Sequence, residues 1–454
     1  MNKNNQNKID MVNGPILNGI ILFALPLALS SFLQQVLNAA DIIVCGRFVG
    51  NHALAAVGVN ANIMNLAINL FLGLSVGVNV VIANYIGMDK KERISPVIHS
   101  VIPFSFLLGI VFTLLGIMFA DDILLIMKTP KDIYEDAMNY LIILLIGMPG
   151  AIVYNFGSAI LRSIGDTKRP LYILIITGII NVIINIILVT VVKLGVRGVA
   201  IATVTSIYLS AIIIFVILTK EEEYLRFDIK KIKLNKEPIL RVLSIGLPSA
   251  LQGAVFSISN ITIQAAINSL GSIAVAGNSA ANNFDSIEYM LLNSFSQAAT
   301  TFTSQNMGAR RVDRLKKIFW CSILTGAIST LLVAGIMYIN LPFLSSLFTE
   351  DVEVMRFMRL RFLCVALPTF LEVGFDTIGG ILRGMGHSNF PAFVIVLGTL
   401  GLRIFWVYTI FRIYNSYTAL LLVYPISWIV MGTIIAIYYA IVRKKDFLAL
   451  ENEI

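Results

Sequence analysis

A single carboxylate, Asp41, lies near the end of a long apolar stretch that runs from Leu25 to Phe48. If this stretch spans a membrane, an ionised carboxylate in it costs about 2.5–3.5 kcal/mol on insertion scales. A chain carries such a cost where the group binds a cation, or where it takes up and releases a proton. The alternative is that Asp41 only marks the wet end of the helix.

Three neutral polar residues in later apolar stretches have the chemistry to join Asp41. Asn181 and Asn185 are four residues apart and therefore share one helix face, and Thr203 lies in the next apolar stretch, GVAIATVTS. One carboxylate, two amide oxygens and a hydroxyl could form a cation site of hard oxygens, with Na+ bound at Asp41. The amides could instead hold a proton on Asp41 in one conformation and release it in another. A third interpretation is that these groups only join helices, at about 0.6 kcal/mol per hydrogen bond.

A second set of acids lies in the later half of the chain. Asp285 and Glu288 (NNFDSIEYM) are three residues apart, and Glu372 and Asp376 (FLEVGFDTIGG) are four apart, so each pair shares a helix face. Two close carboxylates rarely both ionise without a cation between them. We therefore expect a substrate site or a second proton site here, with Arg403 neutralising Asp376 or Glu372. Further residues expected to line a loose amphipathic pocket, each also compatible with simple packing, are Gln34, Gln264, Asn282, Phe256, Tyr154 and Met64.

The composition indicates which elements must position these residues. Of 454 residues, 57% are hydrophobic and 13% are charged, against about 25% charged residues in soluble domains. The mean hydropathy of +0.85 also indicates a membrane protein rather than a soluble one. The net charge of +8 is spread over short segments between apolar runs, so it reflects membrane topology and not nucleic-acid binding.

The apolar stretches predict an all-α integral membrane protein with twelve transmembrane helices. A β-barrel is excluded because the stretches are continuously apolar rather than alternating. The expected spans are residues 16–41, 53–86, 95–119, 134–160, 170–192, 197–218, 239–268, 273–306, 316–340, 355–382, 390–411 and 418–442.

The basic residues predict the orientation and the domains. With the N-terminus inside, inner segments hold about two thirds of the 34 lysines and arginines, which places both termini in the cytoplasm of a cell (plasma) membrane. The polar segment after six spans is expected to be a solvated linker. The expected parts are a cytoplasmic tail (1–15), a six-helix bundle (16–218), a cytoplasmic linker (219–238), a second six-helix bundle (239–442) and a cytoplasmic tail (443–454).

The two halves also form an internal repeat. A shift of 221 or 222 residues places Leu25-Pro26 on Leu247-Pro248 and Gly50 on Gly271. The clearest match is ILRSIGDTKRP (160–170) against ILRGMGHSNFP (381–391). Because each half has six spans, both enter the membrane from the same side, and their pseudo-two-fold axis runs along the membrane normal. Such a repeat suits a transporter in which two bundles rock around a central cleft.

The motifs of enzymes and ATP-driven pumps are missing. There is no Walker A sequence, and the three histidines lie near loops, so neither ATP hydrolysis nor a histidine metal site is expected. The cysteines, Cys45, Cys321 and Cys364, have no metal-binding spacing and are expected to pack. The chain is therefore not expected to be an enzyme, to hold a cofactor or to bind a metal other than Na+ at Asp41.

Several motifs together resemble the MATE family, the multidrug and toxic compound extrusion transporters, and in particular its bacterial MepA-like branch. The motifs are FALPLALSSFLQQVLNAADIIVCGRFVG, HALAAVGVNANI, LGVRGVAIATV, SQAATTFTSQNMGA and ILRSIGDTKRP. The resemblance covers nearly the whole chain. It implies two six-helix bundles that face a central cavity, and export of organic cations in exchange for Na+ or H+.

The resemblance also assigns roles to residues. It implies that Asp41, at the proline-plus-15 position of the first helix, is the family's cation-binding carboxylate, joined by Asn181 and Thr203. Asn185 stands where many members have Asp, which leaves the coupling ion open. Phe256 stands where some members have a cation-binding Glu, so that second site is incomplete, although Asp285 and Asp376 match its other acids.

We therefore predict a Na+- or H+-coupled antiporter that exports amphipathic organic cations by alternating access. Its expected partners are these small molecules and membrane lipids, and we expect a monomer. The alternative is a flippase for lipid-linked oligosaccharides of the same superfamily, which the mainly acidic intramembrane charges disfavour. A channel or receptor would show a filter loop or ligand domain, and the sequence contains neither.

Overall fold

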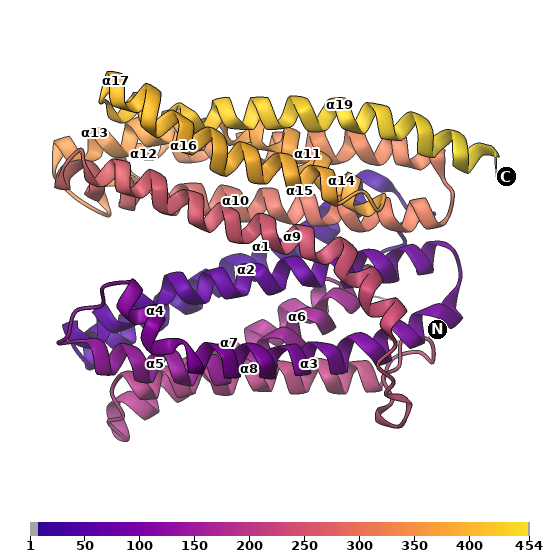
Figure 1. Ribbon diagram of the computed structural model, residues 1–454, viewed down its shortest axis with the longest axis horizontal. Helices are drawn as coiled ribbons and strands as arrows, with labels where there is room; N and C mark the ends of the chain where they lie inside the picture. Colours follow the sequence, from indigo (N-terminus) through magenta and orange to yellow (C-terminus); the bar gives the residue numbers. More distant parts are fainter. Residues whose placement is uncertain (1–7, 453–454) are drawn as a thin grey trace. The chain divides into compact units, whose positions relative to one another are not determined.

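The computed structural model describes residues 8–452, except the side chain of Asn62, and this part of the chain folds only into helices and the turns between them. The helices up to residue 219 are α1 (Ile16–Phe48), α2 (Asn51–Gly87), α3 (Ile94–Met118), α4 (Ala120–Ile126), α5 (Tyr134–Ile146), α6 (Met148–Ser163), α7 (Lys168–Ile186) and α8 (Val196–Thr219). Those that follow are α9 (Lys236–Asn268), α10 (Ser272–Gly308), α11 (Val312–Ile339), α12 (Leu341–Ser346), α13 (Val352–Arg361), α14 (Val373–Gly384), α15 (Asn389–Val396), α16 (Leu402–Trp406), α17 (Arg412–Tyr414), α18 (Tyr417–Leu421) and α19 (Val423–Asn452). Figure 1 shows their arrangement.

Wider π-helical turns interrupt several long helices. They are η3 (Ile187–Val191), η5 (Phe362–Ala366), η7 (Leu397–Gly401) and η8 (Val407–Phe411). Short 3-10 turns are η2 (Lys91–Arg93), η4 (Ile229–Lys231) and η6 (Leu367–Glu372).

The predicted all-helical membrane fold is confirmed. Within the described residues, ten helices are long and apolar enough to cross a membrane, or eleven if α5 and α6 form one span. The remaining long helix of the predicted twelve is α10, which has 37 residues but carries polar side chains such as Asn278, Asn282 and Glu288. These polar residues bear on function because most of them are buried inside the protein.

The span predicted at 134–160 is sharply bent. Helices α5 and α6 meet at an angle of 43°, because Pro149 in the first turn of α6 has no backbone N–H to donate. The π-helical turns η7 and η8 lie within the span expected at 390–411, which is nevertheless one continuous helical segment from Asn389 to Tyr414. Pro149 is a sequence signal for the bend, whereas the apolar pattern does not report the π-helical turns.

The chain divides into two compact units. The first comprises Lys8, Leu29–Tyr85 and Lys90–Leu243, and the second comprises Ile9–Ala28, Ile86–Asp89 and the chain from Ser244 onward. The start of α1 groups with the second unit because Ile20 and Phe23 pack in one cluster with Phe295 and Phe302. This division differs from the predicted boundary at 219–238, which stays a prediction.

The internal repeat is visible in the backbone and in side-chain contacts. Helices α1 and α9 both have 33 residues with an interior proline, and α2 and α10 both have 37. The turns between them use Gly50 and Gly271 at positive φ, 120° and 100°, a conformation that a side chain would strain. In the first unit Arg162 donates to Ser75, and in the second Arg383 donates to Ser296, its counterpart.

Within each unit, small residues allow the helices to approach closely. A Cβ at Gly109 would collide with the backbone of Pro149, so α3 and α6 pack at this glycine. In the second unit a Cβ at Gly380 would lie 2.8 Å from the Ser296 carbonyl oxygen of α10. Large apolar side chains on the outer faces, such as Leu114 and Ile179, are exposed as expected of a lipid-facing surface.

The segment 219–238 packs in part against α3, so the expectation of a simple solvated linker is wrong. Leu225 and Phe227 are buried, and the Phe227 ring stacks on His99 with 5.3 Å between ring centroids. The Asp228 backbone N donates to Nε2 of His99 at 2.9 Å. The apolar residues among the charges give this segment a side that binds the helix.

A candidate cation site and the buried polar clusters

The structure brings together the residues that the sequence placed around Asp41. Asp41 lies on α1 in the first unit with 8% of its surface exposed. Asn185 on α7 donates from Nδ2 to Oδ1 of Asp41 at 2.7 Å, and Thr203 on α8 donates from Oγ1 to Oδ2 at 3.0 Å. Three helices distant in sequence thus converge on one carboxylate.

Asn181 completes the cluster. Its Nδ2 donates to Oδ1 of Asp41 at 3.2 Å and its side-chain oxygen accepts from the Thr203 backbone N at 3.3 Å. Both polar atoms of this amide are thereby satisfied, and a third neutral group donates to the carboxylate.

Two further atoms are suited to an exchanging proton or cation. Thr203 Oγ1 lies 3.1 Å from the Val199 carbonyl oxygen as well as 3.0 Å from Asp41, so its single hydrogen can point either way. When it points to Val199, Oγ1 is free to accept a hydrogen bond from a protonated Asp41 or to ligate a cation. The side-chain oxygen of Asn185 is buried without a hydrogen-bond partner, which leaves one more acceptor available.

No built-in positive charge balances Asp41. Among the described residues no Lys, Arg or His forms an ion pair with it, and its surroundings include the buried Cys45 and Tyr140. Residues 8–452 also contain no group of three or more His, Cys, Asp or Glu that could hold a metal ion, so a transition-metal site is not indicated. A carboxylate in such a place is neutralised by a proton or by a bound cation of the Na+ type.

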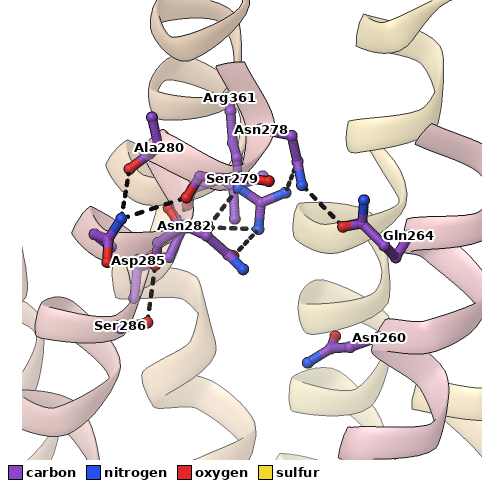
Figure 2. Close-up of polar contacts among 12 residues, drawn as sticks. Asn260, Gln264, Asn278, Ser279, Ala280, Asn282, Asp285, Ser286 and Arg361 are labelled. Atoms are coloured by element: carbon purple, nitrogen blue, oxygen red, sulfur yellow. Dashed lines mark hydrogen bonds and ion pairs between the residues drawn. The ribbon is translucent and has the colours of Figure 1, made fainter. Parts of the chain in front are cut away.

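In the second unit, Asp285 has a cationic partner, unlike Asp41. Arg361 lies at the end of α13 and is 4% exposed, and its Nε donates to Oδ2 of Asp285 at 2.8 Å (Figure 2). Its other nitrogens donate to the side-chain oxygens of Asn278 at 2.6 Å and Asn282 at 2.8 Å. The sequence reasoning missed Arg361, which was counted among the basic residues outside the membrane. The one available signal was that Arg361 falls inside the predicted span 355–382.

The predicted pocket residue Gln264 belongs to the same network. Its Oε1 accepts from Asn278 at 3.2 Å, and its Nε2 donates to Asn268 at 2.9 Å. Tyr417 donates to the Asn278 oxygen at 3.1 Å. In Figure 2 Gln264 and Asn260 lie on one helix across from the Arg361 cluster. Asp285 is already paired with Arg361, so it needs no added cation.

Two of the predicted acids lack such a partner. Glu288 is fully buried, neither of its oxygens has a hydrogen bond of normal geometry, and the neighbouring Thr369 hydroxyl donates to Val365. Glu372 is 4% exposed. No ion pair within the described part of the chain includes either residue.

Arg403 does not form the ion pair that we expected. Its Nη1 donates to Ser259 at 3.3 Å and to Asn260 at 3.1 Å, and its guanidinium lies 4.5 Å from the ring centroid of Tyr424. A second ring, Phe256, lies 5.1 Å away. Aromatic faces thus contact this cation. Its charge also acts on the buried Glu372, one of the two acids expected as its partner, without an ion pair between them. Asp376 lies instead 3.9 Å from Nη2 of Arg383.

The remaining pocket candidates do not gather at one place. Gln34 is exposed on α1. Tyr154 is buried and donates to the Pro170 carbonyl at 3.1 Å, which is a packing role. Met64 packs against the apolar cluster that includes Cys45, and the Phe256 ring stacks on Tyr289.

Comparison with known proteins identifies the class of this chain. The family model MatE matches twice, at residues 26–187 and 248–409, and the two matches begin at Pro26 and Pro248. The chain belongs to the MATE family. The family consists of transporters, and the double match confirms the internal repeat.

Individual relatives of this MATE transporter agree with that assignment. This chain is 30% identical over 441 residues to the "Probable multidrug resistance protein YoeA" of Bacillus subtilis, and the match covers 93% of each chain. A structure described as the outward-facing conformation of a multidrug resistance MATE family transporter has 23% identity and a TM-score of 0.87, covering 98% of this chain and 99% of that one. The MATE fold and a multi-pass membrane location follow, whereas the MepA-like branch stays a prediction.

A third neighbour shows that the fold alone does not determine the substrate. A MOP superfamily transporter from Pyrococcus furiosus, whose description reads "Reverse polarity of binding pocket suggests different function", has 22% identity and a TM-score of 0.88, with 98% of this chain and 99% of that chain covered. The substrate of the present transporter must therefore be argued from its own residues.

Proposed function

We propose that this MATE transporter is a cation-coupled antiporter that exports amphipathic organic cations by alternating access, with H+ or Na+ bound at Asp41 as the coupling ion. One observation carries the proposal. Asp41 is buried among neutral hydrogen-bonding groups and has no cationic partner among the described residues, so it must gain and lose a companion ion to stay buried.

The neighbours of Asp41 would hold the coupling ion. For Na+, the available ligands are the carboxylate, the Thr203 hydroxyl and the amide oxygens of Asn181 and Asn185. For H+, the same groups stabilise either the protonated or the ionised carboxyl. Coupling requires that the ion and the exported cation bind one conformation of the transporter better than another.

The substrate class rests on weaker support. The relative from Bacillus subtilis is named a probable multidrug resistance protein, and four acids of the second unit, Asp285, Glu288, Glu372 and Asp376, lie within predicted membrane spans. Arg361 and Arg383 form ion pairs with Asp285 and Asp376, so the acids without an ion pair, available to an organic cation or to a second proton, are Glu288 and Glu372.

The arrangement in the membrane follows the charges of the loops. We propose that both termini lie in the cytoplasm, since the segments on their side of the membrane hold most of the lysines and arginines. Export then moves substrate away from the side of the termini.

One assay tests the coupling. Purified transporter is reconstituted in vesicles, and efflux of a fluorescent organic cation is measured under an imposed Na+ gradient and, separately, an imposed pH gradient. We expect one gradient to drive efflux in the wild type and neither to do so in Asp41→Asn, while thermal unfolding stays close to wild type. Equal efflux without any gradient would contradict coupling, and normal coupled efflux by Asp41→Asn would contradict the role of Asp41.

A further inference from the structure

A cavity of about 430 Å³ opens on the second unit between α11 and α19. Its lining comes from one turn of α11 and from one face of the last three turns of α19. The lining residues are Lys316, Trp320, Ala440, Arg443, Lys444, Phe447, Leu448 and Glu451.

The cavity combines positive charge with exposed apolar surface. Lys316, Arg443 and Lys444 line it against a single acid, Glu451. None of these three cations forms an ion pair within the described residues. The Arg443 guanidinium lies 5.7 Å from the ring centroid of Tyr439, a contact that leaves its positive charge without a neutralising acid. Trp320 is 61% exposed, although it is the largest apolar side chain in the lining. A ligand that matches both features carries an anionic group and an apolar part.

The walls of the cavity are fixed in place. The rings of Phe319 and Tyr439 stack at 4.5 Å with 5° between their planes and join α11 to α19 directly beside the cavity. The end of α19 is held by a hydrogen bond of 2.9 Å between His387 and Asp446. Phe447 also packs into a cluster with residues of α11. The basic side chains therefore project from an ordered surface and not from a loose tail.

The lining residues lie where a membrane meets water. Helix α19 has 30 residues, so it is about 45 Å long, whereas the hydrocarbon core is about 30 Å thick. Its apolar run ends at Val442 and three basic residues follow, which marks the level of the lipid headgroups. Tryptophan is enriched at this level because its ring is apolar and its N–H is polar.

The corresponding surface in the first half is already covered by protein. The shift that places Arg93 on Arg314 places His99 of α3 on Trp320 of α11. His99 is only 3% exposed because Phe227 of the segment after α8 stacks on it. Among the described residues, no segment covers Trp320 in the same way. The surface around His99 in the first half is thus covered by protein, whereas the corresponding surface around Trp320 in the second half is open.

From this cavity we propose a site for the headgroup of an anionic phospholipid, one of which is phosphatidylglycerol. Lys316, Arg443 and Lys444 bind the lipid phosphate, and Trp320 and Leu448 contact the glycerol and the first part of the acyl chains. A basic pocket between helices at the membrane surface is the geometry that binds such headgroups. The lipid takes the place that Phe227 and its segment occupy in the first half.

Tryptophan fluorescence tests the site because Trp320 lies in it. The purified full-length transporter in neutral detergent is titrated with phosphatidylglycerol brominated near its headgroup, and with phosphatidylcholine brominated at the same positions. We expect the brominated phosphatidylglycerol to quench the tryptophan fluorescence at a lower concentration than the brominated phosphatidylcholine does. Trp320→Phe should remove most of this quenching, although Trp406 and Trp428 remain.

Two double variants distinguish lipid binding in the cavity from general attraction of anionic lipid by surface charge. Lys316→Ala/Lys444→Ala removes two cavity cations, and Lys317→Ala/Lys445→Ala removes two exposed cations of the neighbouring positions on the same helices. The first should weaken phosphatidylglycerol binding by about fivefold for each cation removed. The second should change binding clearly less.

Three results would overturn the proposal. Equal losses in the two double variants would show that only the net charge matters. Equal quenching by the two lipids would show that the anionic headgroup is not recognised. Displacement of the lipid by soluble glycerol phosphate at a similar concentration would show a site for a free phosphate and not for a lipid.

Discussion

The two halves of this MATE transporter differ in the buried charges that they carry. The shift that places Pro26 on Pro248 places Asp41 on Ile263, so the second half has no carboxylate at this position. In the first unit a buried carboxylate is surrounded by neutral donors and has no cation. In the second unit a buried guanidinium lies against two aromatic rings, and an apolar residue replaces the carboxylate.

The difference in buried charge indicates different roles for the two units, although their helices are similar. A carboxylate without a permanent partner must exchange a proton or cation, and that exchange can be coupled to a conformational change. Asp285 in the second unit is instead neutralised by Arg361, and that ion pair needs no exchange. We infer that the coupling ion is bound by the first unit and that the arginines of the second unit mainly hold its helices together.

The largest effect is expected from breaking the ion pair of the second unit. Arg361→Leu leaves Asp285 buried without its partner and removes the bonds to Asn278 and Asn282. Loss of one partner of a buried ion pair costs about 3–5 kcal/mol, so we expect a much lower thermal unfolding temperature in detergent. The double variant Arg361→Leu/Asp285→Leu should recover part of the loss. If Arg361→Leu unfolds like the wild type, the ion pair is not structural.

The next largest effect is expected from removing the hydroxyl beside Asp41. Thr203→Val keeps the shape of the side chain but removes the group that lies 3.0 Å from the carboxylate. A hydrogen bond to a charged group is worth about 1.5–3 kcal/mol, so the coupling-ion concentration for half-maximal efflux should change at least about tenfold. Thr203→Ser retains the hydroxyl and should stay near wild type. Equal behaviour of the two variants would remove Thr203 from the ion site.

A second carboxylate beside Asp41 should strengthen binding of the coupling ion. Asn185→Asp places an acid next to Asp41, and two adjacent carboxylates favour a bound cation or proton. We expect the affinity for the coupling ion to rise at least about fivefold, since one added unit charge about 4 Å away is worth about 1 kcal/mol even with the dielectric constant of water. The readout is again the ion concentration for half-maximal efflux. An unchanged value would show that Asn185 does not face the ion.

An exposed, paired carboxylate gives the smallest effect and serves as a reference. Lys8 donates to Glu222 at 2.7 Å and holds the pKa of Glu222 below its usual 4.5. The stabilisation is therefore present above pH 4.5 and is lost as the pH falls through the lowered pKa. Because the Glu222 side chain is 45% exposed, screening by solvent limits the stabilisation from this ion pair to a few tenths of a kcal/mol. Glu222→Gln should remove this part of the acid dependence of thermal unfolding, and Glu223→Gln should not.

The sequence predicted the Asp41 cluster well because its elements are regular. Asp41, Asn181, Asn185 and Thr203 lie on three apolar helices, where an intramembrane polar residue usually faces another. Their role in ion binding stays a prediction. The bend at Pro149 and the π-helical turns were not predicted because they depend on local hydrogen bonding that apolar periodicity does not report.

The polar network of the second unit was predicted less well. Arg361 stands near the end of a charged helical segment, VEVMRFMRLR, so its sequence context is that of a surface helix. Arg403 forms no ion pair with either expected acid, although its charge acts on Glu372, because aromatic faces and amides contact the guanidinium directly. Only the packing of distant helices determines which of several buried charges meet.

The most direct test of the central claim is to measure the ion that leaves Asp41 when substrate binds. Purified transporter is mixed with an excess of an organic cation, once in unbuffered solution with a pH electrode and once after loading with radioactive sodium. The account predicts release of H+ or Na+ from the wild type and no release from Asp41→Asn, although that variant remains folded. Release from Asp41→Asn equal to that of the wild type would contradict the account.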